Sequence, residues 1–188
     1  MKKNNLEDKK ERKNKLRVLL PLLLLAGAAL SYGIWRLADH LCEQGGLILR
    51  NWVSDTLLSA TFLCLVTGVI LLILLIRIKV LKVILILLTS LLIAISSYYL
   101  FIAVVLFHKP EHVVDRDGEK YVAVVGAFLD TDVNYYEYEN IFSYKQNIRI
   151  NEWYGEGASD PLKNGYDKRP EPRRTQWFEY DDEGNRVY

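Results

Sequence analysis

The chain has 188 residues, a net charge of +1 and a mean hydropathy of +0.04, values that an ordinary soluble protein would share. These averages combine two unlike halves. Residues 18–107 contain three long apolar runs, whereas residues 108–188 are polar and carry 17 acidic and 11 basic side chains. The basic residues are concentrated in a short N-terminal tail and not in a folded domain, which argues against a nucleic-acid partner. Both cysteines precede residue 108, so a disulfide framework or cysteine metal cluster in the C-terminal half is excluded.

The first 17 residues form a basic tail, with eight Lys or Arg and three acidic residues. Lys and Arg beside a membrane-spanning helix are retained in the cytoplasm and attract anionic lipid headgroups. We therefore predict that residues 1–17 are a cytoplasmic tail.

Three apolar runs follow, at 18–38, 57–76 and 83–107, and each has the roughly 20 residues needed to cross the hydrocarbon core. The second and third contain no charged residue. The first resembles the apolar part of a signal peptide, but it continues through Tyr32 and Trp35, which favours an uncleaved anchor. Residues 18–107 are therefore predicted to form a three-helix transmembrane region, and the lipid bilayer is the first expected partner.

Small side chains recur at helical spacing in the first two runs, where they would allow close packing of helices in lipid. The predicted packing residues are Gly27, Ser31, Ala60, Cys64 and Gly68. The third run carries hydroxyl side chains at positions 89, 90, 96 and 97, which suit either hydrogen bonds between helices or a polar lining. No Asp, Glu, Lys, Arg or His lies at bilayer depth, which argues against a self-contained transporter.

The positions of positive charges predict the orientation. The link between the second and third runs holds Arg77, Lys79 and Lys82, whereas the link between the first and second holds Arg50, with Arg36 at its margin. Positive charge inside places the N-terminus in the cytoplasm and the C-terminal domain outside it. Trp35 and Trp52 then fall at the outer boundary, where indole rings favour the headgroup layer.

Residues 108–188 show short runs of β-forming residues separated by turn residues. A hairpin is predicted over 112–125 around an Asp-x-Asp-Gly turn, a strand over 147–153, a long loop over 155–174 and a closing hairpin over 176–188. Residues 135–144 could be a strand or an aromatic-rich surface. The fold class predicted is membrane α + β, with three transmembrane helices followed by a small β-rich extracytoplasmic domain, as a small sheet or partial barrel.

Aromatic side chains in an acidic setting dominate this domain, and Tyr and Trp are enriched at recognition surfaces. The candidate interaction surface consists of Tyr135, Tyr136, Tyr138, Tyr144, Trp153, Tyr154, Trp177 and Tyr180. The competing interpretation is that a small domain poor in Leu and Ile builds its core from these rings.

No catalytic, cofactor or metal site is predicted. Residues 130–134 begin like a calcium loop, but Tyr135 and Ile141 stand where that loop needs Gly and Glu. His108 and His112 have helical spacing, yet Pro110 between them disfavours a helix. No nucleophile elbow or phosphate-binding glycine loop is present. An enzymatic activity is unsupported rather than excluded.

The sequence thus predicts a small membrane protein that presents a binding domain outside the cytoplasm, as an accessory, sensory or immunity-type component of a membrane complex. The expected partner is a membrane or extracytoplasmic protein, or a second copy of the chain. The alternative is a component of a membrane-embedded enzyme or transporter whose polar site is completed by another chain.

Overall fold

The computed structural model describes residues 2–107, 109–127, 129–157, 159–171 and 176–187. The chain divides into two compact units. One consists of Met1–Leu37 and Ser54–Phe101 and is helical. The other consists of Ala38–Val53 and Ile102–Tyr188 and is built around a β-sheet. The linker between the first two helices therefore belongs to the same unit as the C-terminal domain.

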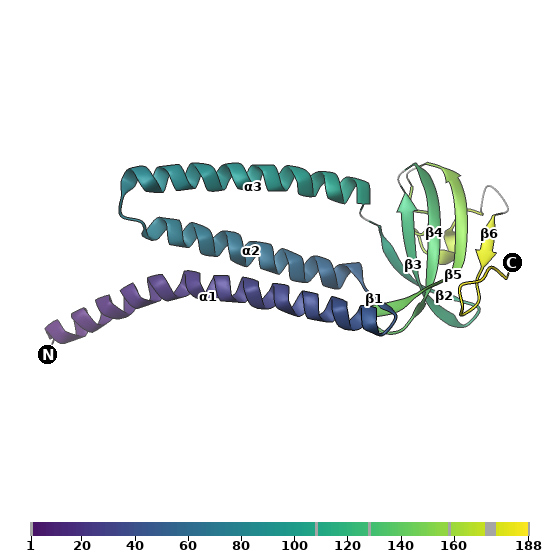
Figure 1. Cartoon of the computed structure of the whole chain (residues 1–188), viewed down its shortest axis with the longest axis horizontal. Coiled ribbons are helices and arrows are strands. Elements are labelled where there is room, and N and C mark those ends of the chain that lie inside the picture. The colour runs from purple at the N-terminus through teal and green to yellow at the C-terminus, as the bar shows by residue number, and fades with distance from the viewer. Residues whose placement is uncertain (1, 108, 128, 158, 172–175, 188) are drawn as a thin grey trace. The chain divides into compact units, whose positions relative to one another are not determined.

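Three helices, α1 (Lys2–Gln44), α2 (Asn51–Leu75) and α3 (Lys79–Phe107), account for the apolar part of the chain (Figure 1). Each contains a segment long and apolar enough to cross a membrane, at Lys15–Gln44, Asn51–Leu75 and Lys79–Ile102. The first and third predicted runs lie within α1 and α3, and the second, 57–76, extends one residue beyond the end of α2. α1 extends beyond its run at both ends and includes Pro21 in its interior, which helices in a membrane tolerate.

Two glycines end α1 and lead directly into a strand. The amide of Gly45 donates to the carbonyl of Leu41, and Gly46 adopts a positive φ of 66°. This left-handed conformation after a helix is one that glycine adopts without steric cost. The three-residue strand β1 (Leu47–Leu49) follows, and α2 begins two residues later.

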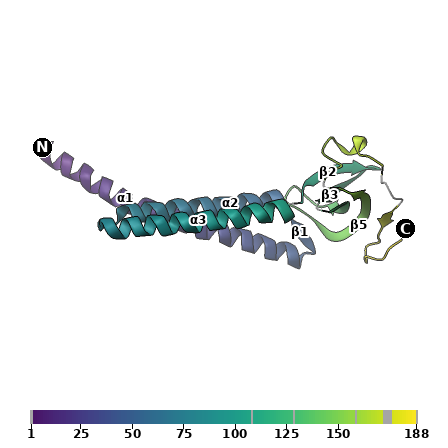
Figure 2. The same cartoon turned by 90° about the horizontal axis from the view of Figure 1, so that it is seen from above.

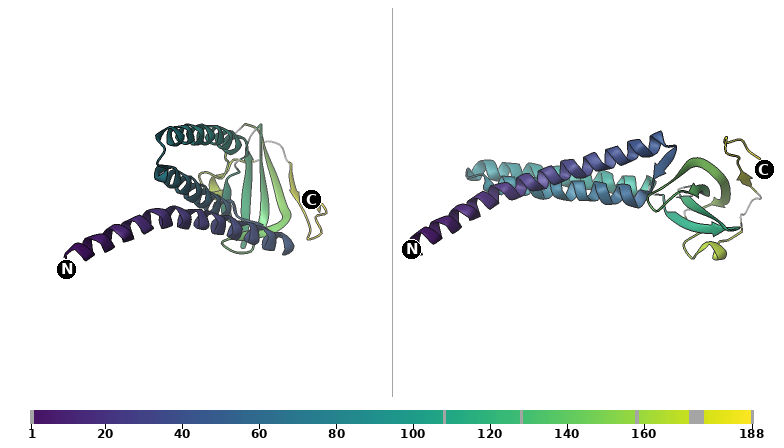
Figure 3. Two further views of the ribbon diagram at one scale, coloured as in Figure 1. Left: turned by 60° about the vertical axis from the view of Figure 1, so that its left-hand side comes forward. Right: turned by 90° about the horizontal axis from the view of Figure 1, so that it is seen from below.

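The second unit is an antiparallel sheet of six strands, curled into a half-barrel (Figure 2; Figure 3, right). Its remaining strands are β2 (Glu111–Arg116), β3 (Glu119–Ala127), β4 (Asp130–Tyr138), β5 (Ser143–Glu156) and β6 (Trp177–Glu179). The order is β1-β5-β4-β3-β2, and β6 also pairs with β5. The pairing of β4 with β5 contains three register shifts, and such bulges bend and twist a sheet. The predicted partial barrel is confirmed as a half-barrel.

The predicted first hairpin is confirmed as β2 and β3, joined by Asp117 and Gly118. Both residues have positive φ, 56° and 86°. Positive φ at both central positions is the hallmark of a type I′ turn, for which Asp-Gly is a favoured pair because its twist matches that of the strands. The closing hairpin is also confirmed, since Tyr180 bridges to Arg186 after β6.

Two clusters of buried side chains hold the sheet together. Because neighbouring residues of a strand point to opposite faces, Ala123 and Val125 of β3 lie on one face and Val122 and Val124 on the other. The larger cluster contains Val114, Ala123, Val125, Val133, Tyr135, Ile150, Tyr154 and Leu162. The smaller contains Val122, Val124 and Tyr144. Leu162 comes from the long loop after β5, which therefore covers the first face.

Candidate functional site

A buried carboxylate lies at the centre of the larger cluster. Glu152 of β5 is only 3% exposed. Its Oε2 accepts hydrogen bonds from the hydroxyls of Tyr135 and Tyr154, both at 2.7 Å, and its Oε1 accepts one from Arg116 at 3.1 Å. The Nε of Arg169 lies 3.5 Å from Oε2. Glu152 is thus surrounded by donors, as a buried charge requires.

The two tyrosines of this network are held in their neutral form. Burial, together with the nearby charge of Glu152, raises the pKa of Tyr135 far above its ordinary value. Burial and the hydrogen bond to Glu152 likewise raise the pKa of Tyr154. Because both hydroxyls donate to a carboxylate, the protonated phenol is the form that the site stabilises. These groups are therefore poor candidates for a general base or a nucleophile at neutral pH.

Aromatic rings cover both arginines of the network. The guanidinium carbon of Arg116 lies 5.4 Å from the ring centre of Trp177 and 5.9 Å from that of Tyr135. That of Arg169 lies 3.9 Å from the ring centre of Tyr166. Cation–π contacts of this kind stabilise a cation that has lost part of its hydration. They connect β2, β6 and the long loop around the same carboxylate.

Asp160 fastens the long loop to the edge strand β2. Its Oδ2 lies 2.8 Å from Nε2 of His112, and its Oδ1 accepts a hydrogen bond from the amide of Leu162 at 2.9 Å. Leu162 is thereby directed into the core, where it is 2% exposed. His112, one of the two histidines considered above as metal ligands, is engaged in this contact, and His108 lies outside the described residues. Within the described ranges, no group of three or more His, Cys, Asp or Glu side chains could hold a metal ion.

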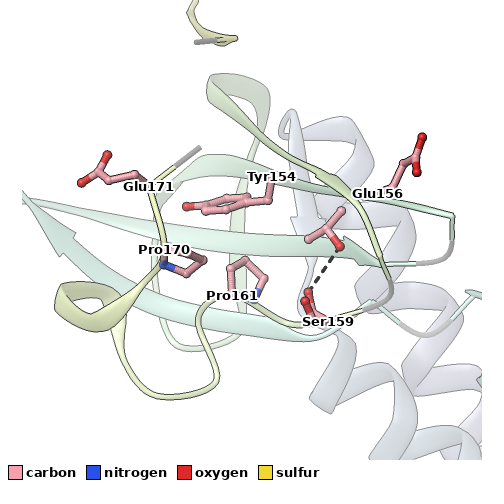
Figure 4. A pocket seen from close by; sticks show the side chains of 7 residues that line it. Tyr154, Glu156, Ser159, Pro161, Pro170 and Glu171 are labelled. Atoms are coloured by element: carbon pink, nitrogen blue, oxygen red, sulfur yellow. Dashed lines mark hydrogen bonds between the residues drawn. The ribbon is translucent and has the colours of Figure 1, made fainter. Parts of the chain in front are cut away.

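A small pocket opens beside this network, with a volume of about 70 Å³. The ring of Tyr154 and two prolines, Pro161 and Pro170, line it (Figure 4). Thr131 also lines the pocket, and its hydroxyl donates to the carbonyl of Ser159 at 3.3 Å. Two exposed carboxylates, Glu156 and Glu171, stand at opposite sides of the rim and point away from its centre (Figure 4). This volume suits the end of one extended side chain or about two waters.

The predicted aromatic surface is divided between the two faces of the sheet. Tyr135 and Tyr154 are buried in the larger cluster, against which Trp177 packs. Tyr144 is buried in the smaller cluster, where Tyr136 and Tyr138 pack against it. Trp153 and Tyr180 are partly exposed. The eight residues therefore do not form one exposed patch. Tyr135, Tyr144 and Tyr154 are buried in the core, and an interaction role for the eight residues stays a prediction.

The predicted helix-packing residues fall into two groups. A Cβ built on Gly68 would lie 3.0 Å from Cδ2 of Leu25, so α1 and α2 approach closely there. The hydroxyl of Ser31 donates to the carbonyl of Leu57 at 2.9 Å, which links the same two helices. Around Gly27, by contrast, a Cβ would meet nothing within 4 Å, and the neighbouring Ala28 is the buried residue.

The remaining two packing residues are less enclosed. Ala60 is exposed, and Cys64 is partly buried. Neither Cys42 nor Cys64 is in a disulfide.

Between α2 and α3, Thr89 and Ser90 line a largely apolar cavity of about 180 Å³ together with Ile70, Ile73, Leu74, Ile86 and Ile93. Both interpretations of these hydroxyls, hydrogen bonds between helices and a polar lining, stay open alternatives.

A third cluster of contacts joins the start of α2 to the start of β2. Glu111 accepts a hydrogen bond from the amide of Asn51 at 3.0 Å and one from Nε of Arg50 at 3.3 Å. The side-chain amide of Asn51 donates to the carbonyl of Lys109 at 2.9 Å. A carboxylate at a helix N-terminus satisfies a free backbone amide and complements the helix dipole. Glu111 therefore stabilises the point at which α2 leaves the β-unit.

Sequence reasoning missed Glu152, Arg116 and Arg169 as parts of a site. One signal was available: Ile150, Glu152 and Tyr154 alternate along a strand whose apolar members face the core, so Glu152 must share that face. Its partners come from β2, β4 and the long loop, and their convergence depends on the curl of the sheet.

Comparison with known protein families, with curated proteins and with solved structures finds no match to this chain.

Proposed function

We propose that this chain is a membrane-anchored binding protein whose half-barrel recognises a cationic side chain of a partner protein or peptide outside the cytoplasm. The observation that carries the proposal is the pocket beside Tyr154, with an aromatic wall, two prolines and the two rim carboxylates Glu156 and Glu171. Aromatic faces and carboxylates both attract cations, and small pockets of this kind fix one group of a larger partner.

The charge of the domain supports a basic partner. Residues 108–188 have a net charge of −6, while the rest of the chain has +7. A surface of one sign steers partners of the opposite sign and raises the rate of encounter. The buried network does not supply this field, because Glu152 is matched by two arginines. The exposed carboxylates of the domain therefore provide the attraction.

The proposed location rests on three spans and on their flanking charges. An odd number of crossings places the two ends of the chain on opposite sides, and the basic tail and the α2–α3 link favour the cytoplasm. Near the start of α3, Nζ of Lys82 donates to the carbonyl of Leu74 at 3.0 Å, which satisfies one of the last carbonyls of α2. The proposed extracytoplasmic side of the half-barrel follows from these features.

Peptide binding to the full chain in lipid nanodiscs tests the proposal. The probe is a fluorescent peptide with a central lysine, compared with the same peptide carrying acetyl-lysine. We expect the lysine form to bind more tightly, and the double substitution Glu156→Gln, Glu171→Gln to weaken its binding about tenfold, since the loss of two charged contacts has this order of magnitude.

Glu183→Gln is the matched control, because Glu183 is an exposed carboxylate of the closing hairpin and does not line the pocket. It removes one negative charge without changing the rim and should leave binding nearly unaltered. Equal binding of both peptides, or equal losses in the rim and control variants, would contradict a specific pocket and leave only general charge attraction.

The alternative, a component of a membrane-embedded enzyme or transporter, would use the cavity between α2 and α3. The two hydroxyls there, from Thr89 and Ser90, are its polar groups, and the other lining side chains are aliphatic. A completed polar site would need charged or further polar groups from another chain. The half-barrel pocket is therefore the better-supported site.

A further inference from the structure

The turn between β4 and β5 presents two exposed apolar side chains. Ile141 is 55% exposed and Phe142 is 54% exposed. Beside them, the ring of Trp52 at the start of α2 is 44% exposed, and its centre lies 5.8 Å from that of Phe142. Trp52 and the turn belong to the same compact unit. Three large apolar side chains thus form one exposed apolar tip.

Several polar groups of this tip are paired within the protein. Oδ1 of Asn140 accepts hydrogen bonds from the amides of Phe142 at 2.8 Å and Ser143 at 3.1 Å. Nε1 of Trp52 donates to the carbonyl of Ile141 at 3.2 Å, and the amide of Arg50 donates to the carbonyl of Phe142 at 2.8 Å. Paired backbone groups are what a segment needs to enter a region poor in water.

Trp52 connects the tip to the chain segment in which α2 begins. Trp52 is the second residue of α2, whose candidate membrane span is Asn51–Leu75. Side chains that contact the first turn of a spanning helix lie at the depth of the membrane surface. Trp and Tyr rings favour this layer, because it accommodates an apolar ring and a polar group together.

We infer that the apolar tip, formed by Ile141, Phe142 and Trp52, rests in the headgroup–acyl boundary of the bilayer that α2 enters. Its ligand is the lipid surface, and the contact anchors the half-barrel close to the membrane. The attraction is apolar, so it operates with neutral lipids and at high salt. The inference rests on the proposed insertion of α2, and the experiment below separates the two.

Strand β4 provides an internal comparison. Its nine residues span roughly 30 Å, with the apolar tip beyond Tyr138 at one end and Leu129 before Asp130 at the other. Leu129 is 74% exposed, more than either apolar residue of the turn. If exposure alone mattered, both ends of β4 would be equally accessible to water. If the tip contacts the membrane, the tip is accessible to lipid and Leu129 is accessible to water.

Depth-dependent quenching tests the inference with the full chain in phosphatidylcholine nanodiscs. Cys42 and Cys64 are replaced by Ser, and one new cysteine is labelled with an environment-sensitive fluorophore. The three sites are Ile141→Cys at the tip, Leu129→Cys at the far end of β4, and Leu63→Cys in α2, which is 67% exposed. Quenchers are a lipid spin-labelled near its headgroup and aqueous iodide.

We expect lipid quenching at position 141 to exceed that at position 129 several-fold, with the reverse order for iodide, and the fluorophore at position 63 to be protected from iodide. Iodide quenching at 141 equal to that at 129 would overturn the inference while position 63 still reports an inserted helix. Protection of position 141 from both quenchers would also overturn it, because a protein would then cover the tip. Free access of iodide to position 63 would overturn the insertion of α2 and this inference together.

Discussion

Among single residues, Glu152 has the largest structural consequence. Its carboxylate joins the hydroxyls of two core tyrosines and the guanidinium groups of two arginines from different parts of the domain. A buried ion pair contributes little relative to an apolar replacement of the whole group, but removal of one member leaves the others unpaired. The network therefore makes the fold of the half-barrel depend on one side chain.

We predict that Glu152→Gln destabilises the half-barrel by about 3 kcal/mol, because Arg116 and Arg169 lose their counter-charge. For a domain of this size the thermal midpoint should fall by roughly 10 °C or more, as followed by near-ultraviolet circular dichroism of the full chain in detergent. Glu183→Gln, on the exposed closing hairpin, is the control and should leave the midpoint unchanged. A midpoint equally unchanged in Glu152→Gln would show that the network is dispensable.

The tyrosines of the core predict loss of stability at high pH. Burial raises the pKa of Tyr135, Tyr144 and Tyr154 above the ordinary value of 10. Above pH 10 the unfolded chain releases these protons while the folded domain retains them, so the free energy of unfolding falls as pH rises. Their contribution is fully present below pH 10. Unfolding curves at pH 8 and pH 11, with tyrosinate absorbance as a second readout, should show this decrease.

Tyr154→Phe serves as the matched comparison for the alkaline effect. The variant loses a hydrogen bond to a carboxylate, so it is less stable at neutral pH by about 1.5 kcal/mol. It also loses one titrating group, so its stability should decline less steeply above pH 10. An identical slope in the variant and in the original chain would contradict the assignment of Tyr154 as a buried, protonated phenol.

The site shows where residue-level prediction reaches its limit. The turn at Asp117 and Gly118 was predictable because the local sequence determines its backbone conformation. The burial of Tyr135, Tyr144 and Tyr154 was left open, because aromatic residues serve equally in cores and on surfaces. The grouping of Glu152 with Arg116 and Arg169 depends on contacts between residues distant in sequence, which composition and spacing do not determine.

At the scale of secondary-structure elements, β1 is the main feature that the sequence did not reveal. Residues 47–49 read as part of a short link between two membrane helices, but they pair with Ser143–Lys145 of β5. Three residues are too few for a periodic pattern, and their pairing depends on a strand nearly 100 positions later. The longer helices and the first hairpin were predictable, because periodicity and turn chemistry act locally.

We predict that Ile48→Pro detaches β1 from β5. The amide of Gln146 donates to the carbonyl of Gly46, and the amide of Arg50 donates to the carbonyl of Phe142. Hydrogen-bonded pairs recur at every second residue of an antiparallel pair, so Ile48, midway between Gly46 and Arg50, is also a hydrogen-bonded position. Proline removes its amide hydrogen. Hydrogen exchange of residues 143–146 should accelerate, while the β2–β3 hairpin should remain protected.

Leu47→Pro is the control for this change. By the same alternation, the amide of Leu47 points away from β5, and an edge strand tolerates proline at such a position. Each variant introduces one proline into β1, and the two positions are neighbours in the chain. Equal acceleration of exchange in both would indicate a general effect of proline on the link rather than loss of a specific strand pairing.

The contact between α1 and α2 leads to a second prediction at this scale. Gly68→Val would place branched carbons against Leu25 and the carbonyl of Pro21, which lie 3.0 and 3.3 Å from the position of a Cβ. Overpacking of this kind costs about 1–3 kcal/mol. The detergent-unfolding midpoint, followed by far-ultraviolet circular dichroism, should therefore fall.

Gly27→Val is the matched variant in α1, since its Cβ would meet nothing within 4 Å. Both changes replace a glycine in an apolar helix by the same residue, so intrinsic helix propensity cancels between them. A fall in midpoint that is as large for Gly27→Val as for Gly68→Val would contradict the close approach of the two helices at Gly68.

At the scale of the whole molecule, one chain contains a half-barrel and three helices that are long and apolar enough to cross a membrane. The link between α1 and α2 is part of the β-unit, as are the final residues of α3. Hydrogen bonds from Arg50 and Asn51 to Glu111 connect the start of α2 to the start of β2. The chain therefore passes between the helical unit and the β-unit three times.

The central claim, that the chain crosses the membrane three times and exposes the half-barrel outside the cytoplasm, is tested most directly by labelling intact cells. In a variant with Cys42 and Cys64 replaced by Ser, single cysteines are introduced at Lys9 in the basic tail or at Asp182 in the closing hairpin. A membrane-impermeant maleimide should label position 182 in intact cells and position 9 only after lysis. Labelling of both positions, or of position 9 alone, in intact cells would contradict the proposed topology.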